Sequence, residues 1–304
     1  MQFAPKSRSF IGCPEAEFCS PEEAKVVIVP FGLEESVSYG GGASRGPGAI
    51  IKASQQLELF DEEFWCEPYR DYGIATLKKF PIEKSLDRAI QQIKKTTADL
   101  LAKNKFPLIL GGEHSLTVGA VQAAVSKFGK ISILHFDAHA DLRDGYLGAK
   151  FSHAASMRRC LDDKRISLVS VGIRSISAEE ILFLEANSKR IKIFWAKDKE
   201  KWKIAEIIKS LSNNPVYLSF DLDVLDSSSM PVTGTPEPGG LFWNEVLAII
   251  QTVAKKKKIV GADIVELSPI RNLHAPDFLA AKLTYKILSY IFLSSTKKIS
   301  SESL

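Results

Sequence analysis

Residues 131–141 constrain the fold and the chemistry of this chain more than any other segment. The first half of the segment is short, apolar and β-prone, which is typical of a buried strand. The second half places Asp137, His139 and Asp141 at every second position. While the backbone stays extended, residues two apart point to the same side. We therefore expect two carboxylates and an imidazole to gather at the end of a strand, although this stretch alone would also fit a polar strand end that meets solvent.

Two further segments repeat this design. Residues 106–115 form an apolar stretch that stops at two glycines and presents His114. Residues 217–226 form another, which ends in Asp221 and Asp223. In open parallel α/β sheets, binding sites form where the carboxyl ends of strands converge. We expect all six side chains to meet at one edge of a sheet.

Apolar and amphipathic segments alternate along the rest of the chain. Strands are expected near residues 25–30, 166–173, 191–195, 216–220 and 259–265, and helices near 83–104, 116–128, 178–187, 204–211 and 244–255. This alternation predicts a three-layer αβα fold with a central, mostly parallel sheet. No linker, repeat or low-complexity block interrupts it. We expect one domain over residues 1–304, with residues 1–24 as an irregular N-terminal segment.

The expected site is too acidic to stand without cations. Asp137, Asp141, Asp221 and Asp223 would repel one another, because two like charges ~4 Å apart cost on the order of 4 kcal/mol at an effective dielectric near 20. Four carboxylates cannot relieve this by sharing one proton. Two divalent cations would balance the four charges and leave one imidazole for each ion. The oxygen-rich, cysteine-free ligand set favours Mn²⁺ over structural Zn²⁺.

Composition points away from nucleic acids and membranes. The net charge is +4, and the basic residues form scattered clusters such as 255–258 and 297–298, without the aromatic-interleaved stripe of a nucleic-acid site. The N-terminus lacks the apolar core of a signal peptide. The longest largely apolar segment, 287–293, is far shorter than the ~20 residues that cross a bilayer.

Cysteine spacing indicates the redox environment. The chain has four cysteines at unrelated positions: Cys13, Cys19, Cys66 and Cys160. This pattern favours reduced thiols in the cytoplasm over a disulfide framework. We therefore expect a cytoplasmic protein.

Five motifs together resemble the ureohydrolases, the family that includes arginase, agmatinase and guanidinobutyrase. They are Gly-Gly-Glu-His-Ser at 111–115, Asp-Ala-His-Ala-Asp at 137–141, Ser-Phe-Asp-Leu-Asp-Val-Leu-Asp at 219–226, Thr-Gly-Thr-Pro-Glu-Pro-Gly-Gly-Leu at 233–241 and Asp-Ile-Val-Glu-Leu-Ser-Pro at 263–269. The resemblance covers roughly residues 25–292 and implies an arginase-like fold with two Mn²⁺ ions per chain. It departs from the commonest pattern at Glu113, where many members have Asp, and at Ser227, where Pro is usual.

The resemblance also implies roles for single residues. Asp137 and Asp221 would bridge the two metals; His114 and Asp141 would complete one ion, and His139 and Asp223 the other. Glu266 matches the carboxylate that holds the substrate's guanidinium, and His153 the histidine that shuttles protons to the leaving amine. Thr235 is expected to support the guanidinium or its loop. We expect His135 to support the site rather than bind metal, and the Gly-rich residues 37–50 to form its wall.

The substrate is expected to be a small guanidino compound. The loop after Asp141 lacks the arginase pattern and resembles agmatinase, which favours agmatine hydrolysed to putrescine and urea. Asp144 is a candidate for the contact to the distal amine. N1-aminopropylagmatine and guanidinobutyrate remain alternatives, and arginine is a weaker one.

Two other classes of protein stay open at this point. A metal-binding relative without activity would not need His153 and Glu266. A zinc amide hydrolase on a similar fold would need only one metal. The family resemblance also implies a homo-oligomer, either a trimer or a hexamer, while the segment 278–293 could serve the core or an interface.

Overall fold

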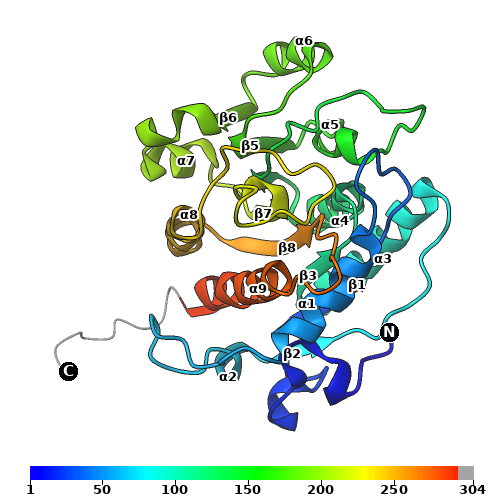
Figure 1. The fold of residues 1–304 in the computed structure, drawn as a ribbon, viewed down its shortest axis with the longest axis vertical. Coiled ribbons are helices and arrows are strands. Elements are labelled where there is room, and N and C mark those ends of the chain that lie inside the picture. The colour runs from blue at the N-terminus through cyan, green and yellow to red at the C-terminus, as the bar shows by residue number, and fades with distance from the viewer. Residues whose placement is uncertain (294–304) are drawn as a thin grey trace.

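One parallel sheet forms the centre of the molecule. The computed structural model describes residues 1–293, and within them eight strands pair in the order β2-β1-β3-β8-β7-β4-β5-β6, every pair parallel. In that order they span Ile74–Thr76, Val26–Phe31, Phe106–Gly111, Ile259–Val265, Val216–Asp221, Ile131–Phe136, Ile166–Ile173 and Ile191–Trp195. Figure 1 shows the sheet running from β6, near the top, to β2, near the bottom.

Helices cover both faces of the sheet, which confirms the predicted three-layer αβα fold. On one face lie α1 (Gly46–Ser54), α2 (Tyr69–Tyr72), α7 (Ile204–Ser210), α8 (Trp243–Lys256) and α9 (Ala275–Leu293). On the other lie α3 (Leu86–Ala102), α4 (Thr117–Phe128), α5 (Ser156–Cys160) and α6 (Ala178–Ala186). Alternate residues of β1 supply the two cores: Val26 and Ile28 pack on the first face, Val27 and Val29 on the second.

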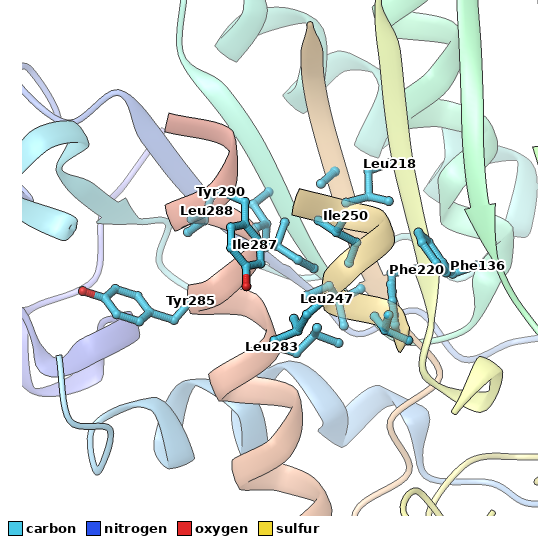
Figure 2. Close-up of a cluster of buried hydrophobic side chains, with 14 of the residues drawn as sticks. Phe136, Leu218, Phe220, Leu247, Ile250, Leu283, Tyr285, Ile287, Leu288 and Tyr290 are labelled. Carbon is cyan, nitrogen blue, oxygen red and sulfur yellow. The ribbon is translucent and has the colours of Figure 1, made fainter. Parts of the chain in front are cut away.

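Helix α9 belongs to the core. Its residues Leu283 and Ile287 pack with Leu247 and Ile250 of α8 over the sheet, where Figure 2 also shows Phe220 of β7. Each of these side chains is at least nine-tenths buried. Removing apolar area from water at ~25 cal/mol per Å² makes this layer a main source of stability. Of the two roles left open for this segment, the structure gives the core.

The N-terminal segment is anchored to the rest of the molecule. It contains three short 3₁₀ turns, Lys6–Arg8, Phe10–Gly12 and Ala16–Cys19. Phe10 is fully buried, and its backbone N–H donates to Oγ1 of Thr76 at 3.0 Å. The elements β2 and α2 were not predicted, because three or four residues are too few to show a period.

The expectation of reduced cysteines is wrong for two of the four. Cys13 and Cys19 form a disulfide, with their Cα atoms 5.8 Å apart. That separation is within the usual range of ~4.4–6.8 Å. The 3₁₀ turn that ends at Cys19 brings the two residues together, and no sequence motif signals such a turn.

None of the helices in residues 1–293 is long and apolar enough to cross a membrane. The lysines at 255–258 lie at the end of α8, and three of them are exposed, as expected of a solvated surface. The basic pair at 297–298 falls outside the described residues.

Candidate metal centre

The six residues predicted as ligands meet at one edge of the sheet. His114 follows β3, Asp221 ends β7 with Asp223 just beyond it, and Asp137, His139 and Asp141 follow β4. The strands β3, β8, β7 and β4 are consecutive neighbours in the sheet. Because the strands are parallel, their carboxyl ends lie side by side, and the topology brings together residues up to 109 positions apart in sequence.

Three carboxylate oxygens converge on Nδ1 of His114. Oδ2 of Asp137 lies at 3.1 Å, Oδ2 of Asp141 at 3.2 Å and Oδ2 of Asp221 at 3.3 Å. This buried nitrogen has no hydrogen-bond partner among the described residues. Two ligand atoms about 2.1 Å from one divalent ion and at a right angle to each other lie about 3.0 Å apart. The spacing therefore fits a shared cation.

Ser219 and Asp263 determine which nitrogen of His114 faces the carboxylates. The Ser219 hydroxyl donates to Oδ1 of Asp263 at 2.7 Å, and its oxygen lies 2.8 Å from Nε2 of His114. Since the serine proton is already used, its oxygen accepts the Nε2–H. The lone pair of Nδ1 then points at the carboxylates, as in histidines that bind metal. Asp263, which the sequence left without a role, thus orients His114.

A second group forms on the other side of Asp137. Nδ1 of His139 lies 2.8 Å from Oδ2 of Asp223 and 3.6 Å from Oδ1 of Asp137. The two oxygens of Asp137 thus face different histidines, and this carboxylate lies between the two groups. Backbone N–H groups hold the carboxylates in place: Ala138 donates to Asp223 at 2.9 Å. The structure therefore contains two His/Asp groups able to hold metal ions. One consists of His114, His135, Asp137 and Asp141, and the other of Asp137, His139 and Asp223.

The electrostatics of the centre require positive charge. Burial raises the pKa of Asp221 well above its ordinary value, and the neighbouring Asp223 and Asp137 raise it further. Burial lowers the pKa of His114, but the surrounding carboxylates outweigh burial and raise it well above its ordinary value. Without a cation, the protonated forms of Asp221 and His114 are therefore favoured. A buried, oxygen-rich set with two imidazoles fits two divalent metal ions.

His135 contacts Asp137 from within strand β4. It is fully buried, with Nε2 2.7 Å from Oδ2 of Asp137 and Nδ1 3.0 Å from Oγ of Ser170. Both ring nitrogens are therefore engaged. The contact fixes the orientation of the carboxylate that lies between the two groups.

Two residues of this site have a strained backbone conformation. Asp141 has φ of 53° and Glu266 has φ of 67°, values rare for residues with a side chain. Such conformations cost on the order of 1–3 kcal/mol each and persist only where the surroundings hold them. Here they turn a metal-facing carboxylate and the Glu266 carboxylate into the same cavity.

A cavity of about 350 Å³ opens over the centre. His153, Glu266 and Thr235 line it together with five of the six predicted ligands: His114, His139, Asp141, Asp221 and Asp223. Oε1 of Glu266 accepts the backbone N–H of His114 at 2.7 Å, and burial raises the pKa of Glu266 to about 8.

Residues 24–289 match the model of the arginase family. The chain belongs to this family. It is 36% identical to an N(1)-aminopropylagmatine ureohydrolase of Synechocystis sp., covering 91% of this chain and 92% of that protein. It is 34% identical to an agmatinase of Pyrococcus horikoshii, covering 88% and 92%.

A solved structure agrees with this assignment. The agmatine ureohydrolase of Thermoplasma volcanium superposes with a TM-score of 0.79 at 33% identity, covering 91% of this chain and 93% of its own. The arginase-like fold expected from the motifs is therefore confirmed.

Two predicted site residues of this arginase-family chain do not line the cavity, the buried Asp137 and the exposed Asp144. Asp144 is 76% exposed, and its Oδ1 pairs with Nη2 of Arg159 at 2.6 Å and Nη2 of Arg158 at 3.4 Å. It does not belong to the cavity lining. The prediction that Asp144 contacts the distal amine is therefore not supported, because the sequence showed a carboxylate in the right loop but not the two arginines of α5 that hold it.

Two other carboxylates line the cavity instead. Glu180 accepts the N–H groups of Leu142 and Ser177, both at 2.7 Å, so both of its oxygens are occupied. Glu237 keeps its carboxylate toward the cavity, with Oε1 3.9 Å from Nε2 of His139. Sequence reasoning missed Glu237, although it stands inside the quoted motif at 233–241.

Arg143 lines the cavity, but its guanidinium is already paired. Its guanidinium pairs with Glu179 and lies 4.9 Å from the centre of the Tyr146 ring. Ring and carboxylate together hold it at the wall. The cavity lining thus combines the carboxylates of the centre with His153 and Tyr146.

Proposed function

We propose that this protein is a manganese-dependent ureohydrolase that converts agmatine and water to putrescine and urea, or N1-aminopropylagmatine to its longer polyamine and urea. The observation that carries the proposal is the meeting of two His/Asp groups, Glu266 and His153 in one cavity. The sequence relatives named for agmatine and for its aminopropyl derivative support the same choice.

Glu266 would bind the guanidinium of the substrate. The His114 N–H already occupies its Oε1, so Oε2 is the oxygen left for an N–H of the planar cation. Burial disfavours the charged form of the Glu266 carboxylate, and a cation beside it would offset this cost. When bound, the two divalent ions supply the Lewis acidity that makes water a nucleophile at neutral pH.

His153 would supply the proton that expels the amine. The leaving alkyl amine has a conjugate acid with a pKa of about 10, so it must be protonated as the C–N bond breaks. Histidine is the natural carrier near neutral pH. His153 lines the cavity, with the Tyr146 ring packed edge-on at 6.1 Å.

Glu237 takes the part in substrate binding that the sequence suggested for Asp144. Of the carboxylates that line the cavity, those of the metal centre and Glu266 have other roles, and both oxygens of Glu180 accept hydrogen bonds. Glu237 therefore remains to meet a distal ammonium. Tyr39 is 86% exposed where it lines the cavity, so its ring stands at the mouth. An aromatic face there would suit a second ammonium of the longer substrate.

Other substrates fit this lining less well. Guanidinobutyrate carries only a carboxylate at its far end, and arginine carries a carboxylate beside its ammonium. Both would therefore place a negative charge near Glu237. The inert-relative hypothesis leaves the placement of His153 and Glu266 in the cavity without a purpose.

A panel of substrates tests the proposal. We expect the Mn²⁺-loaded protein to release urea from agmatine or aminopropylagmatine at least tenfold faster, in kcat/KM, than from arginine or guanidinobutyrate. Preference for arginine would refute the assignment of the distal end. Silence on all four substrates by a metal-loaded protein would favour the inert relative, and activity on acyl-lysines with one ion per chain would favour the zinc amide hydrolase.

The remaining expectations belong to the same proposal. We infer that the chain acts as one ureohydrolase domain, that it takes part in polyamine biosynthesis, that it assembles as a trimer or hexamer, and that it is cytoplasmic. Light scattering on the purified protein measures its oligomeric state.

A further inference from the structure

A chain of hydrogen bonds links His153 to a buried carboxylate outside the metal centre. Oγ of Ser36 lies 3.2 Å from Nδ1 of His153 and accepts the backbone N–H of the same histidine at 2.9 Å. The Ser36 hydroxyl donates to Oε1 of Glu113 at 2.9 Å. Glu113 is fully buried. These three residues come from the segments that follow β1, β3 and β4.

The direction of each bond can be assigned. Glu113 receives four donors: the backbone N–H groups of Glu35 and Ser36, each at 2.7 Å, and the hydroxyls of Ser36 and Ser115. A carboxylate that accepts four bonds is an acceptor only. The single proton of the Ser36 hydroxyl therefore points to Glu113, and the serine oxygen can only accept from His153. In the neutral imidazole the proton must then lie on Nδ1.

We propose that Ser36, held by Glu113, is a positioning residue that fixes the Nδ1–H form of His153 and leaves Nε2 free to exchange protons in the cavity. This inference rests on the proposed function of the site. Neither Ser36 nor Glu113 touches the reacting atoms. The other tautomer, with the proton on Nε2, would aim Nδ1 and the serine oxygen at each other with no proton between them.

The backbone is built to keep this arrangement. The N–H of Glu113 donates to the carbonyl of Leu33 at 2.7 Å, which ties the segment after β3 to the segment after β1. A side chain at Gly112 would put a Cβ 2.0 Å from that same carbonyl oxygen, so the approach requires glycine. These contacts hold the Glu113 carboxylate against the loop that carries Ser36.

The arrangement suits one proton transfer in particular. As the C–N bond to the leaving amine breaks, its electron pair goes to nitrogen and takes the Nε2 proton of the imidazolium. The ring then keeps its Nδ1 proton on Ser36 and is neutral, ready to take a proton from water at Nε2. Ser36 does not change its own protonation at any point.

A double-mutant cycle tests the inference on the Mn²⁺-loaded protein with agmatine. We expect Ser36→Ala to lower kcat by about 10- to 100-fold, as for other partners that orient an active-site histidine, with KM and bound metal unchanged. Ser36→Thr keeps the hydroxyl and should regain most of the loss. In a His153→Ala background, Ser36→Ala should cost less than twofold, because its effect passes through that histidine. An equal loss in both backgrounds would overturn the proposal.

A second readout does not depend on activity. In ¹⁵N-histidine-labelled protein loaded with Mg²⁺, the His153 signals should report a protonated Nδ1 and a bare Nε2 in the native chain, and a shift toward Nε2–H in Ser36→Ala. A native chain with Nε2–H would refute the inference even if urea is released. Absence of urea release by the native enzyme, together with the expected ¹⁵N signals, would instead refute the proposed function and leave the tautomer assignment standing.

Discussion

Nδ1 of His114 lies 3.1 Å from Oδ2 of Asp137, and burial separates both atoms from water. The nitrogen has no hydrogen-bond partner within the described chain, although two further carboxylates lie beside it. Unpaired buried polar atoms cost on the order of 1–3 kcal/mol each. A cation between the two residues removes this cost, and this relationship is the physical basis of the metal assignment.

The first prediction concerns the Asp137 carboxylate. Asp137→Asn should lower bound Mn²⁺ from two ions to one or fewer per chain and reduce kcat for agmatine by at least about 100-fold. Elemental analysis after gel filtration measures the metal. Asp144→Asn is the matched control, because Asp144 pairs with Arg159 outside the cavity. It should keep two ions and an agmatine KM within twofold of the native value, and loss of metal in the control would argue against the assignment.

The second prediction concerns the distal end of the substrate. Glu237→Gln should raise the KM for agmatine about tenfold, a factor that corresponds to about 1.4 kcal/mol, with kcat little changed. The carboxylate would otherwise pair with an ammonium in a partly desolvated cavity. The same change should reduce the difference in kcat/KM between agmatine and guanidinobutyrate. An unchanged KM would show that another group binds the amine.

The third prediction separates a required glycine from a tolerated one. Gly112→Ala should destabilise the protein by about 1–3 kcal/mol or prevent folding, because its Cβ would meet the Leu33 carbonyl oxygen at 2.0 Å. Gly48→Ala lies in α1 with nothing within 4 Å of the added atom. It should be neutral or stabilise by up to about 1 kcal/mol. Urea unfolding of the two variants gives the comparison, and equal effects would contradict it.

The fourth prediction concerns a buried lysine of α9. Nζ of Lys286 lies 3.0 Å from Oδ1 of Asp61 and 2.7 Å from Oε1 of Glu63, and its side chain is 2% exposed. Lys286→Met should cost about 3–5 kcal/mol, because it leaves the fully buried Asp61 carboxylate without a cationic partner.

The pH dependence of this lysine has a definite sign. Burial lowers the pKa of Lys286, but hydrogen bonds with Glu63 and Asp61 outweigh burial and raise it above its ordinary value of 10.5. A group whose pKa is higher in the folded state stabilises fully below its unfolded value and less as pH rises through the folded one. The stability difference between native and Lys286→Met should therefore be constant from pH 7 to 9 and shrink above pH 10.5. A difference that grows with pH would contradict this.

Much of the fold and the metal centre could be predicted because both depend on local patterns. Strands that end in Asp-x-His-x-Asp and Asp-x-Asp show their chemistry at adjacent positions, and the parallel sheet then brings them together. Asp137 and His139, two positions apart in sequence, lie close together in the structure, with Nδ1 of His139 3.6 Å from Oδ1 of Asp137. Between Asp221 and Asp223 the backbone leaves the strand for a 3₁₀ turn, yet both carboxylates still reach the site.

The features that could not be predicted depend on contacts between distant segments. Asp144 looked available because its partners Arg158 and Arg159 follow on a separate helix. The role of Ser36 depends on Glu113, 77 residues away. In the sequence, Glu113 looked like a replacement of Asp without consequence. The Cys13–Cys19 disulfide depends on a turn without a sequence signature. In each case the spatial partner, not the residue type, decides the role.

The most direct test of a binuclear ureohydrolase is a metal titration followed by urea release. Protein stripped with a chelator is titrated with Mn²⁺, and urea formed from agmatine is measured at each ratio of metal to chain. We expect no urea without metal and full activity only as the ratio approaches two. Activity that saturates at one ion per chain, or urea release from the stripped protein, would contradict the two-metal site.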